Sequence, residues 1–520
     1  MKLVTSSQMR ALDERAIREC GIPGRVLMDR AGREVARCVR DLIDWRKDRH
    51  ARVLLAAGKG NNGGDAFAAA RYLTEWGIPC AVWLAGARSA AEADAAWHLE
   101  RMDAARAPLL EKPAESDWDR ADATGWTVAV DGLLGTGIKG DARGVAAAGI
   151  RCLNRLASTA VIVAVDVPSG LDADGGSGEG PAVEADVTVT MGLPKRGFVL
   201  GRGPACVGSV LVADIGIPDG LTETVDAAWE LVTERDVRAW LPRRPRDSNK
   251  GTFGHALLVS GSSEYPGAAA LAGSAAARSG AGLVTAWVPR SIAHTVAVGV
   301  PEIITQGVGK GGQGGVSGAP DGGVRGRPLD PFSAILAGPG LGASPYTRAV
   351  VEDLLDRCNV PLVLDADALN VQRLKEGLLT RARAPLILTP HPGEMARFLG
   401  LTVREVQADR IGLAERVANT TGATVVLKGS GTVVASPGHR PAINLTGNPG
   451  MAKGGCGDAL AGLLAGLLAQ GIAPFEAACA SVYLHGRAGD RAAWRLSQTG
   501  MKTGDLIEQL PQVFRDVCAR

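Results

Sequence analysis

The sequence predicts an α/β protein made of two domains. Short apolar runs rich in β-branched residues end in clusters of Gly, Asp, Asn or Ser, and they alternate with Ala- and Leu-rich segments of helical period. This alternation is typical of parallel sheets whose faces are covered by helices. The length of 520 residues exceeds what one hydrophobic core usually organises, and the two halves show no convincing sequence repeat. We therefore expect two different α/β domains in one chain.

The expected strands fall into two groups. In the first half they lie at residues 53–57, 81–84, 127–130, 161–165 and 187–190. In the second half they lie at residues 256–259, 283–287, 334–337, 361–364, 385–388 and 424–427. Prolines and charges at 241–250 suit an exposed connector. We predict domains at residues 1–225 and 246–520, joined by a linker at 226–245.

The segment 307–328 is rich in glycine and has no apolar period. Such segments form long loops, and some long loops close over ligands as lids. We expect a solvated loop here, with a lid as the alternative.

Polar residues follow three predicted strands of the first half. Asn62 lies in the string GKGNNGGD, Asp131 opens DGLLGTGIKG, and Asp166 and Ser169 lie in DVPSGLD. Because the carboxyl ends of parallel strands share one edge of the sheet, these side chains can converge on a single crevice. Each of them alone could equally cap a helix or a turn. Their coincidence beside glycines favours a binding site.

The first of these strings contains G-x-G-x-x-G, which by itself suggests a dinucleotide site. A dehydrogenase of the usual kind also needs an acidic residue after the next strand, to bind the ribose. The sequence there is AVWLAGAR, which has none. The pattern therefore disfavours an ordinary dehydrogenase.

Together the three strings resemble the signatures of the NAD(P)H-hydrate epimerase family, the YjeF-type N-terminal domain, over about residues 1–220. The resemblance implies a Rossmann-like three-layer α/β fold, a potassium ion bound by Asn62, Asp131 and Ser169, and Asp166 as the general acid/base. Oxygen ligands suit such a hard cation. It also implies that hydrated nicotinamide cofactor contacts Asn61, Asn62, Gly63, Gly64, Asp65, Gly135, Thr136, Gly137, Ile138, Lys139, Gly140, Asp141 and Asp166.

The first half departs from this family at two positions. The family commonly has Gly where this chain has Ala66, and Ala or Ser where it has Gly132. Neither difference removes a functional side chain.

The second half contains a glycine loop at the start of an apolar helix. The string GNPGMAKGGCGD at 447–458 precedes the helix predicted at 459–470. Backbone N–H groups and the helix dipole at such a position favour anions, so residues 455–457 can stabilise a transferring phosphoryl group. Asp458 can take a proton from an attacking hydroxyl. The alternative is a helix-capping Asp after a flexible loop. No Walker-type G-x-x-x-x-G-K-[ST] motif occurs in the chain.

This loop resembles the G-x-G-D motif of ribokinase-type kinases, and the full string is closer to ADP/ATP-dependent NAD(P)H-hydrate dehydratase, over about residues 245–515. Supporting motifs follow in order: KGTFGH, YPGA with SGAGL, AGPGLG, LDADALN, TPHPGE and LKGSGT. The resemblance implies that hydrated cofactor contacts Ala268, Gly340, His391 and Asp458. It implies that the adenine nucleotide contacts Lys428, Gly429, Ser430, Gly431, Thr432 and Gly457.

Several of these residues have a second interpretation. Cys456 stands where the family usually has Ser or Thr, and a cysteine at a helix N-terminus is alternatively a reactive nucleophile. His391, between two prolines, is alternatively a structural histidine. Asp365 and Asp367 either orient water or magnesium, or cap the next helix.

The two resemblances imply a bifunctional NAD(P)H-hydrate repair enzyme. It would epimerise the R and S forms of NADHX and NADPHX and would dehydrate the S form with nucleotide, releasing phosphate. The implied cofactors are K⁺ in the first domain, Mg²⁺, and ADP or ATP as phosphate donor, with ADP favoured. We expect a homo-oligomer. The alternative is a ribokinase-type vitamin or sugar kinase fused to a non-catalytic nucleotide-binding module.

Composition excludes several other classes. A net charge of +2 and 4% aromatic residues disfavour nucleic-acid binding. No apolar stretch approaches the ~18 residues of a membrane-spanning helix. The nine cysteines are scattered without a C-x-x-C pair, which disfavours disulfides and zinc and fits a reducing cytoplasm.

Overall fold

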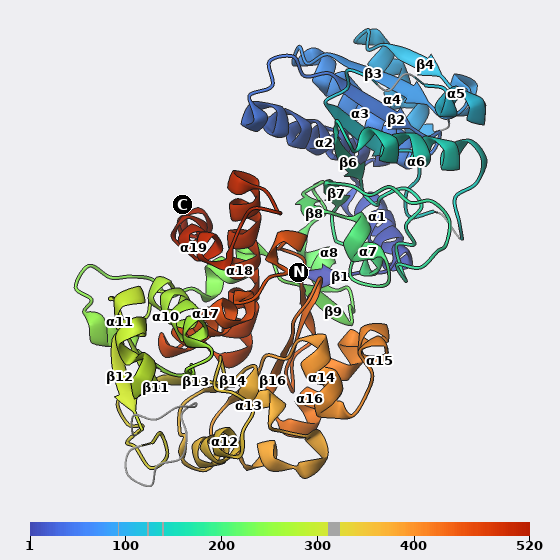
Figure 1. Ribbon diagram of the computed structural model, residues 1–520. Coiled ribbons are helices and arrows are strands. Elements are labelled where there is room, and N and C mark those ends of the chain that lie inside the picture. The colour runs from blue at the N-terminus through green and yellow to red at the C-terminus, as the bar shows by residue number, and fades with distance from the viewer. Residues whose placement is uncertain (92, 122–123, 138–139, 310–322, 520) are drawn as a thin grey trace. The chain divides into compact units, whose positions relative to one another are not determined.

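The computed structural model consists of two compact units, Lys2–Ala228 and Trp229–Arg520, the latter including Met1 (Figure 1). It describes residues 1–91, 93–121, 124–137, 140–309 and 323–519. Ile138, Lys139 and residues 310–322 of the expected loop lie outside the described residues. The fold class predicted from the sequence, a two-domain α/β protein, is confirmed.

The first unit is built on a parallel sheet of order β4-β3-β2-β5-β6-β7-β8. The strands are β2 (Val53–Ala57), β3 (Cys80–Leu84), β4 (Leu109–Glu111), β5 (Val128–Gly132), β6 (Val161–Val165), β7 (Val187–Met191) and β8 (Ser209–Ala213), besides a short β1 (Lys2–Leu3). The helices are α1 (Ser6–Cys20), α2 (Gly24–Arg46), α3 (Asn61–Glu75), α4 (Ala93–Ala104), α5 (Glu115–Asp119), α6 (Gly144–Leu156), α7 (Gly203–Cys206) and α8 (Asp219–Glu223).

Helices cover both faces of this sheet, which is why its central strands are continuous apolar runs. Leu54 and Ala56 of β2 belong to a core cluster with Leu153 of α6, and all five residues of β2 are buried. Strand order reverses between β2 and β5, because β2 leads to β3 on one side while β5 and β6 lie on the other. The loops after β2 and β5 therefore separate at this point, where open α/β sheets usually bind ligands.

The second unit contains a longer sheet, in which the order runs β9-β18-β17-β16-β15-β14-β13-β10-β11-β12. Pairs β16–β17 and β17–β18 are antiparallel, and the pairs from β16 through β12 are parallel. The strands are β9 (Trp229–Leu231), β10 (His255–Val259), β11 (Leu283–Pro289), β12 (Ile304–Val308), β13 (Ala334–Ala337), β14 (Leu362–Leu364), β15 (Leu386–Leu388), β16 (Thr424–Leu427), β17 (Thr432–Ala435) and β18 (Ala442–Asn444).

The helices of the second unit are α9 (Glu234–Trp240), α10 (Pro266–Arg278), α11 (Ala293–Gly299), α12 (Pro345–Arg357), α13 (Asp367–Asn370), α14 (Pro392–Leu399), α15 (Val403–Ala408), α16 (Arg410–Thr421), α17 (Cys456–Ala469), α18 (Pro474–Leu496) and α19 (Thr503–Cys518). Of these, α10, α18 and α19 pack against the apolar helix α17. A Cβ at Gly462 of α17 would lie 2.1 Å from the Ala272 carbonyl oxygen of α10. Glycine therefore permits the close approach of the two helices that form the core.

The structure adds elements that the sequence patterns did not indicate. Strands β4, β8, β9, β12, β17 and β18 were not expected, and β9 and α9 lie within the stretch 226–245 predicted as linker. Several of these strands are three or four residues long, which is too short to produce a periodic signal. Among the described residues, no helix is both long and apolar enough to cross a membrane.

Candidate active sites

Asn62, Asp131 and Ser169 form one oxygen-rich cluster at the carboxyl ends of β2, β5 and β6. The Ser169 hydroxyl donates to Asp131 Oδ1 at 2.6 Å, and the Ser169 N–H donates to Asp131 Oδ2 at 2.7 Å. The Asn62 amide donates to the carbonyl oxygens of Leu134 and Val165 at 2.7 and 2.9 Å. The predicted convergence of strand ends therefore brings these side chains and two carbonyl groups together.

Asp131 makes this cluster suitable for a cation. Its side chain is fully buried, and burial raises its pKa to about 6 despite hydrogen bonds from Ser169 that lower it. Within the described residues, no Lys, Arg or His side chain forms an ion pair with Asp131. A buried carboxylate among neutral oxygens fits a monovalent cation, which prefers such ligands.

Close packing shapes the loop between β2 and α3. A Cβ at Gly63 would lie 1.8 Å from the Gly58 carbonyl oxygen, so only glycine fits there. A Cβ at Gly135 would lie 3.2 Å from Asn62 Oδ1, which places the two predicted binding loops in contact. Asp141 is exposed, and it accepts hydrogen bonds from the N–H groups of Glu179 and Gly180 at 3.0 and 2.8 Å.

The two departures from the family pattern in the first half lie against each other. A Cβ at position 132 would lie 2.8 Å from the Ala66 Cβ. The methyl group of Ala66 thus occupies the space that a side chain at position 132 would need. A Cβ at position 132 would also lie 2.9 Å from the Asn62 backbone oxygen, so glycine fits this position.

Asp166 follows β6 in an unusual backbone conformation. Its φ is 59°, in the left-handed region that non-glycine residues rarely adopt. The carboxylate accepts from the Thr190 hydroxyl at 3.1 Å and the Met191 N–H at 3.0 Å, and it forms an ion pair with buried Lys195. Strain held by several contacts is common at functional sites.

The second site lies at the N-terminus of α17. Gly455 caps this helix with a φ of 90°, and Asp458 is in its first turn. Burial raises the pKa of Asp458 to about 7, with further increases from the nearby carboxylate of Asp365, while Lys428 lowers it. A carboxyl group that titrates near neutral pH is suited to general base catalysis.

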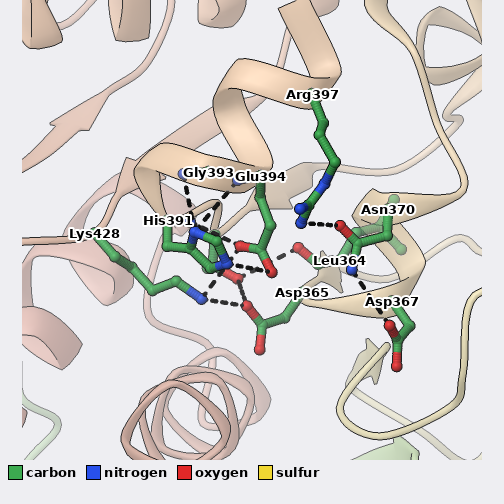
Figure 2. Close-up of polar contacts among 10 residues, drawn as sticks. Leu364, Asp365, Asp367, Asn370, His391, Gly393, Glu394, Arg397 and Lys428 are labelled. Atoms are coloured by element: carbon green, nitrogen blue, oxygen red, sulfur yellow. Dashed lines mark hydrogen bonds and ion pairs between the residues drawn. The ribbon is translucent and has the colours of Figure 1, made fainter. Parts of the chain in front are cut away.

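Lys428 lies in a network of charges with Asp365 and Glu394 (Figure 2). Its ammonium is 2.7 Å from Asp365 Oδ1 and 3.8 Å from Glu394 Oε2. Burial alone would lower the pKa of Lys428, but these carboxylates outweigh burial and raise it. Asp365 Oδ1 also accepts from the Thr389 hydroxyl at 2.7 Å, whereas its Oδ2 is buried without a hydrogen-bond partner among the described residues.

His391 caps α14 and also points toward this charge network. Its Nδ1 accepts from the N–H groups of Gly393 and Glu394 at 3.0 and 3.3 Å, and its Nε2 is 3.4 Å from Glu394 Oε1 (Figure 2). Because Nδ1 accepts, the ring proton belongs on Nε2. The side chain is 49% exposed, so the capping function leaves much of the ring accessible.

Asp367, Ala268 and Gly340 arrange the loop between β13 and α12. Asp367 begins α13 and accepts from the Gly342 N–H at 2.8 Å. A Cβ at Gly340, whose φ is 66°, would lie 2.8 Å from the Ala268 Cβ. The structure thus gives Asp367 a contact that fixes the loop, while Asp365 pairs with Lys428.

The loop 428–432 approaches the start of α17. A Cβ at Gly457 would lie 3.3 Å from the Lys428 ammonium nitrogen. Half-buried Arg410 donates to the carbonyl oxygens of Leu427, Lys428 and Gly431 at 3.1 to 3.3 Å and thereby fixes the loop. Ser430 and Thr432 complete the loop, and the Thr432 hydroxyl donates to the Gly429 carbonyl oxygen at 2.8 Å. Cys456 is buried, with its sulfur 3.3 Å from the Thr503 hydroxyl.

Sequence reasoning missed four residues that hold these sites together. They are Lys195, Glu394, Arg410 and Asp490, the last of which accepts from Gly447 N–H at 3.1 Å and Asn448 at 3.0 Å. A signal existed for Lys195, because it follows a predicted strand as the other site residues do. Glu394, Arg410 and Asp490 make their contacts with residues far away in the sequence, so no local sequence pattern indicates them.

Comparison with known proteins relates both units to one family. A family model described as YjeF-related protein N-terminus matches residues 24–197, and one described as NAD(P)H-hydrate dehydratase matches residues 256–512. Over 526 residues the chain is 42% identical to the bifunctional NAD(P)H-hydrate repair enzyme Nnr of Moorella thermoacetica, covering 99% of this chain and 97% of that one. The chain belongs to the bifunctional NAD(P)H-hydrate repair enzymes. The family inferred from the sequence motifs is therefore confirmed.

Further comparisons support this family assignment. The Salinibacter ruber enzyme is 37% identical over 98% of this chain and 96% of its own length. A crystal structure of ADP/ATP-dependent NAD(P)H-hydrate dehydratase from Bacillus subtilis, co-crystallised with ATP/Mg²⁺, is 34% identical with a TM-score of 0.50. It covers 55% of this chain and 98% of that chain. The ribokinase-like assignment of the second unit of this repair enzyme is thereby confirmed.

Proposed function

We propose that this chain repairs hydrated nicotinamide cofactors in two steps. The first unit interconverts the R and S epimers of NADHX and NADPHX, and the second dehydrates the S epimer with phosphate from an adenine nucleotide. The observation that carries this proposal is the pairing, in one chain, of a buried acid cluster at a sheet edge with Asp458, whose pKa is about 7, at a glycine-rich helix start. Full-length similarity to named repair enzymes supports it.

In the second unit, Asp458 removes the proton from the C6 hydroxyl of the hydrated ring. The hydroxyl oxygen attacks the terminal phosphorus of the nucleotide, the bond from this phosphorus to the bridging oxygen breaks, and the shortened nucleotide leaves. The backbone N–H groups of residues 455–457 stabilise the transferring phosphoryl group. Loss of phosphate and of a C5 proton then restores the ring double bond. Ala268, Gly340 and His391 contact the hydrated cofactor, while Lys428, Gly457 and the loop 429–432 contact the nucleotide.

In the first unit, Asp166 acts as the acid/base in epimer exchange. The loops at Asn61–Asp65 and from Gly135 to Asp141 contact the hydrated cofactor. Asn62, Asp131 and Ser169 would hold K⁺, which would supply a positive charge to the buried carboxylate and orient a substrate oxygen. These residues position the substrate over Asp166 at the sheet edge.

The phosphate donor needs Mg²⁺ to screen its charge. Among the residues that the structure describes, no group of three or more His, Cys, Asp or Glu side chains is arranged to hold a metal ion. The nucleotide phosphates would therefore provide most of the ligands of Mg²⁺. The preference for ADP over ATP, the homo-oligomeric state and the cytoplasmic location stay predictions from the sequence.

An epimer mixture of NADHX, incubated with the full chain and ADP or ATP, tests this function. We expect absorbance at 340 nm to recover for both epimers, with one phosphate released for each NADH formed. A phosphorylated product that accumulates without recovery of absorbance would instead indicate a kinase. Comparison of ADP with ATP identifies the donor in the same experiment.

The pH dependence of dehydration should reflect Asp458. Its raised pKa of about 7 means that the carboxyl group is protonated below this pH and cannot accept the hydroxyl proton. We expect kcat/KM for S-NADHX to increase with pH through about 7 and to become constant above it. A profile that stays flat down to about pH 5 would contradict the role of Asp458 as base.

A further inference from the structure

A buried lysine lies directly behind the carboxylate of Asp166. The Lys195 side chain is 0% exposed, and its ammonium donates to Asp166 Oδ1, to the Thr190 hydroxyl at 3.0 Å and to the Met191 carbonyl oxygen at 3.1 Å. All three N–H donors of the ammonium are therefore used. A buried charge is tolerated only with such complete pairing.

These contacts bind one carboxylate oxygen of Asp166, Oδ1, and leave the other oxygen, Oδ2, without such a partner. Lys195, the Thr190 hydroxyl and the Met191 N–H all donate to Oδ1, and Oδ2 accepts none of these bonds. The Asp166 side chain remains 16% exposed. Oδ2 is thus the oxygen that a substrate can reach.

Two further carboxyl groups face the same ammonium from other elements. Asp13 comes from α1 and Asp65 from the first turns of α3. Burial raises the pKa of Asp13 to about 6 and that of Asp65 well above its usual range, and in both cases Asp166 raises the pKa while Lys195 lowers it. Asp13 Oδ1 is buried without a hydrogen-bond partner among the described residues.

One ammonium cannot balance three neighbouring carboxylates, so they compete for its charge. Lys195 forms its ion pair with Asp166, and no ion pair to Asp13 or Asp65 occurs in the described part of the chain. We propose that Lys195 is a positioning residue of the epimerase site, which binds Asp166 in preference to Asp13 and Asp65 and holds its Oδ2 toward the substrate. This inference rests on the proposed epimerase function.

The substitution Lys195→Met tests it, because methionine removes the charge and keeps an apolar side chain. Without the ammonium, Oδ1 of Asp166 loses its charged partner, and Oδ2 is no longer held toward the substrate. We expect kcat for exchange of R- and S-NADHX, followed by chromatography, to fall at least tenfold, whereas KM changes less than about threefold. Lys195→Arg keeps the charge and should restore most of the rate.

Two further variants separate charge from packing. Lys195→Gln keeps a hydrogen-bond donor without the charge, and we expect the same loss of kcat, which provides the test if the methionine variant does not fold. Lys112→Met removes another buried lysine of this unit, whose ammonium donates to the Asp117 carbonyl oxygen at 2.9 Å, and should leave kcat for exchange unchanged. The inference fails if the neutral Lys195 variants keep the normal kcat or if Lys112→Met reproduces the loss. Absence of exchange in the unsubstituted chain would instead reject the epimerase function.

Discussion

Replacement of Asp458 by Asn is expected to reduce nucleotide-driven recovery of 340 nm absorbance from S-NADHX by about 100-fold or more. Asparagine is similar in size but cannot accept the hydroxyl proton, so the oxygen attacks phosphorus without a base. The N–H groups at residues 455–457 and the charge network of Lys428 remain. Because these groups bind rather than react, KM should change much less than kcat. Steady-state rates with S-NADHX and either nucleotide measure both quantities.

Glu405→Gln provides the matched control for this variant. Glu405 is an exposed acidic residue in the first turn of α15, so the substitution removes a carboxylate from another helix start. Its dehydration rate should equal that of the unsubstituted chain. Epimer exchange should be intact in both variants, because Asp166 lies in the other unit. Near-normal recovery in Asp458→Asn would show that another group accepts the proton.

Replacement of Asp166 by Asn should reduce epimer exchange by about 100-fold or more while S-NADHX is still dehydrated. Asparagine tolerates the left-handed conformation of residue 166, where φ is 59°, better than alanine does. The variant therefore removes the acid/base with little added backbone strain. With an epimer mixture and nucleotide, recovery of absorbance should stop once the S epimer is consumed. Chromatography should then find the R epimer unconverted.

Asp214→Asn is the appropriate comparison for this second variant. Asp214 also follows a strand directly, after β8, and its Oδ1 accepts from the Gly216 N–H at 2.8 Å. It is exposed, and loss of its charge should leave exchange unchanged. If Asp166→Asn exchanges the epimers at the rate of Asp214→Asn, then Asp166 is not the acid/base.

The sequence predicted well those features that depend on local patterns. Asn62, Asp131 and Ser169 lie together because parallel strands end at one edge, and a strand followed by a polar residue is visible in the sequence. Similarly, the glycine loop before α17 lies at a helix start as expected. In both cases, residues that are neighbours in the sequence occupy a known position at the end of a strand or at the start of a helix.

Features that depend on contacts between distant residues could not be predicted in the same way. Lys428 pairs with Asp365 across 63 residues, a distance that follows from the order of β14, β15 and β16 in the sheet. His391 caps α14, and Arg410 binds carbonyl groups of the loop after β16. Both contacts depend on the direction in which the side chain points. A short strand such as β9 forms because β18 is available to pair with it.

The surroundings of Lys428 also affect which form of the nucleotide can bind. Asp365, Glu394 and Asp458 all act electrostatically on the Lys428 ammonium, so the carboxyl groups outnumber the ammonium that they surround. When these groups are ionised they repel a bare polyphosphate, and a lysine already bound to Asp365 exerts little long-range attraction. The magnesium complex carries less negative charge and is repelled less. We therefore expect the metal-bound donor to bind more tightly than the free nucleotide, and added salt to reduce this difference.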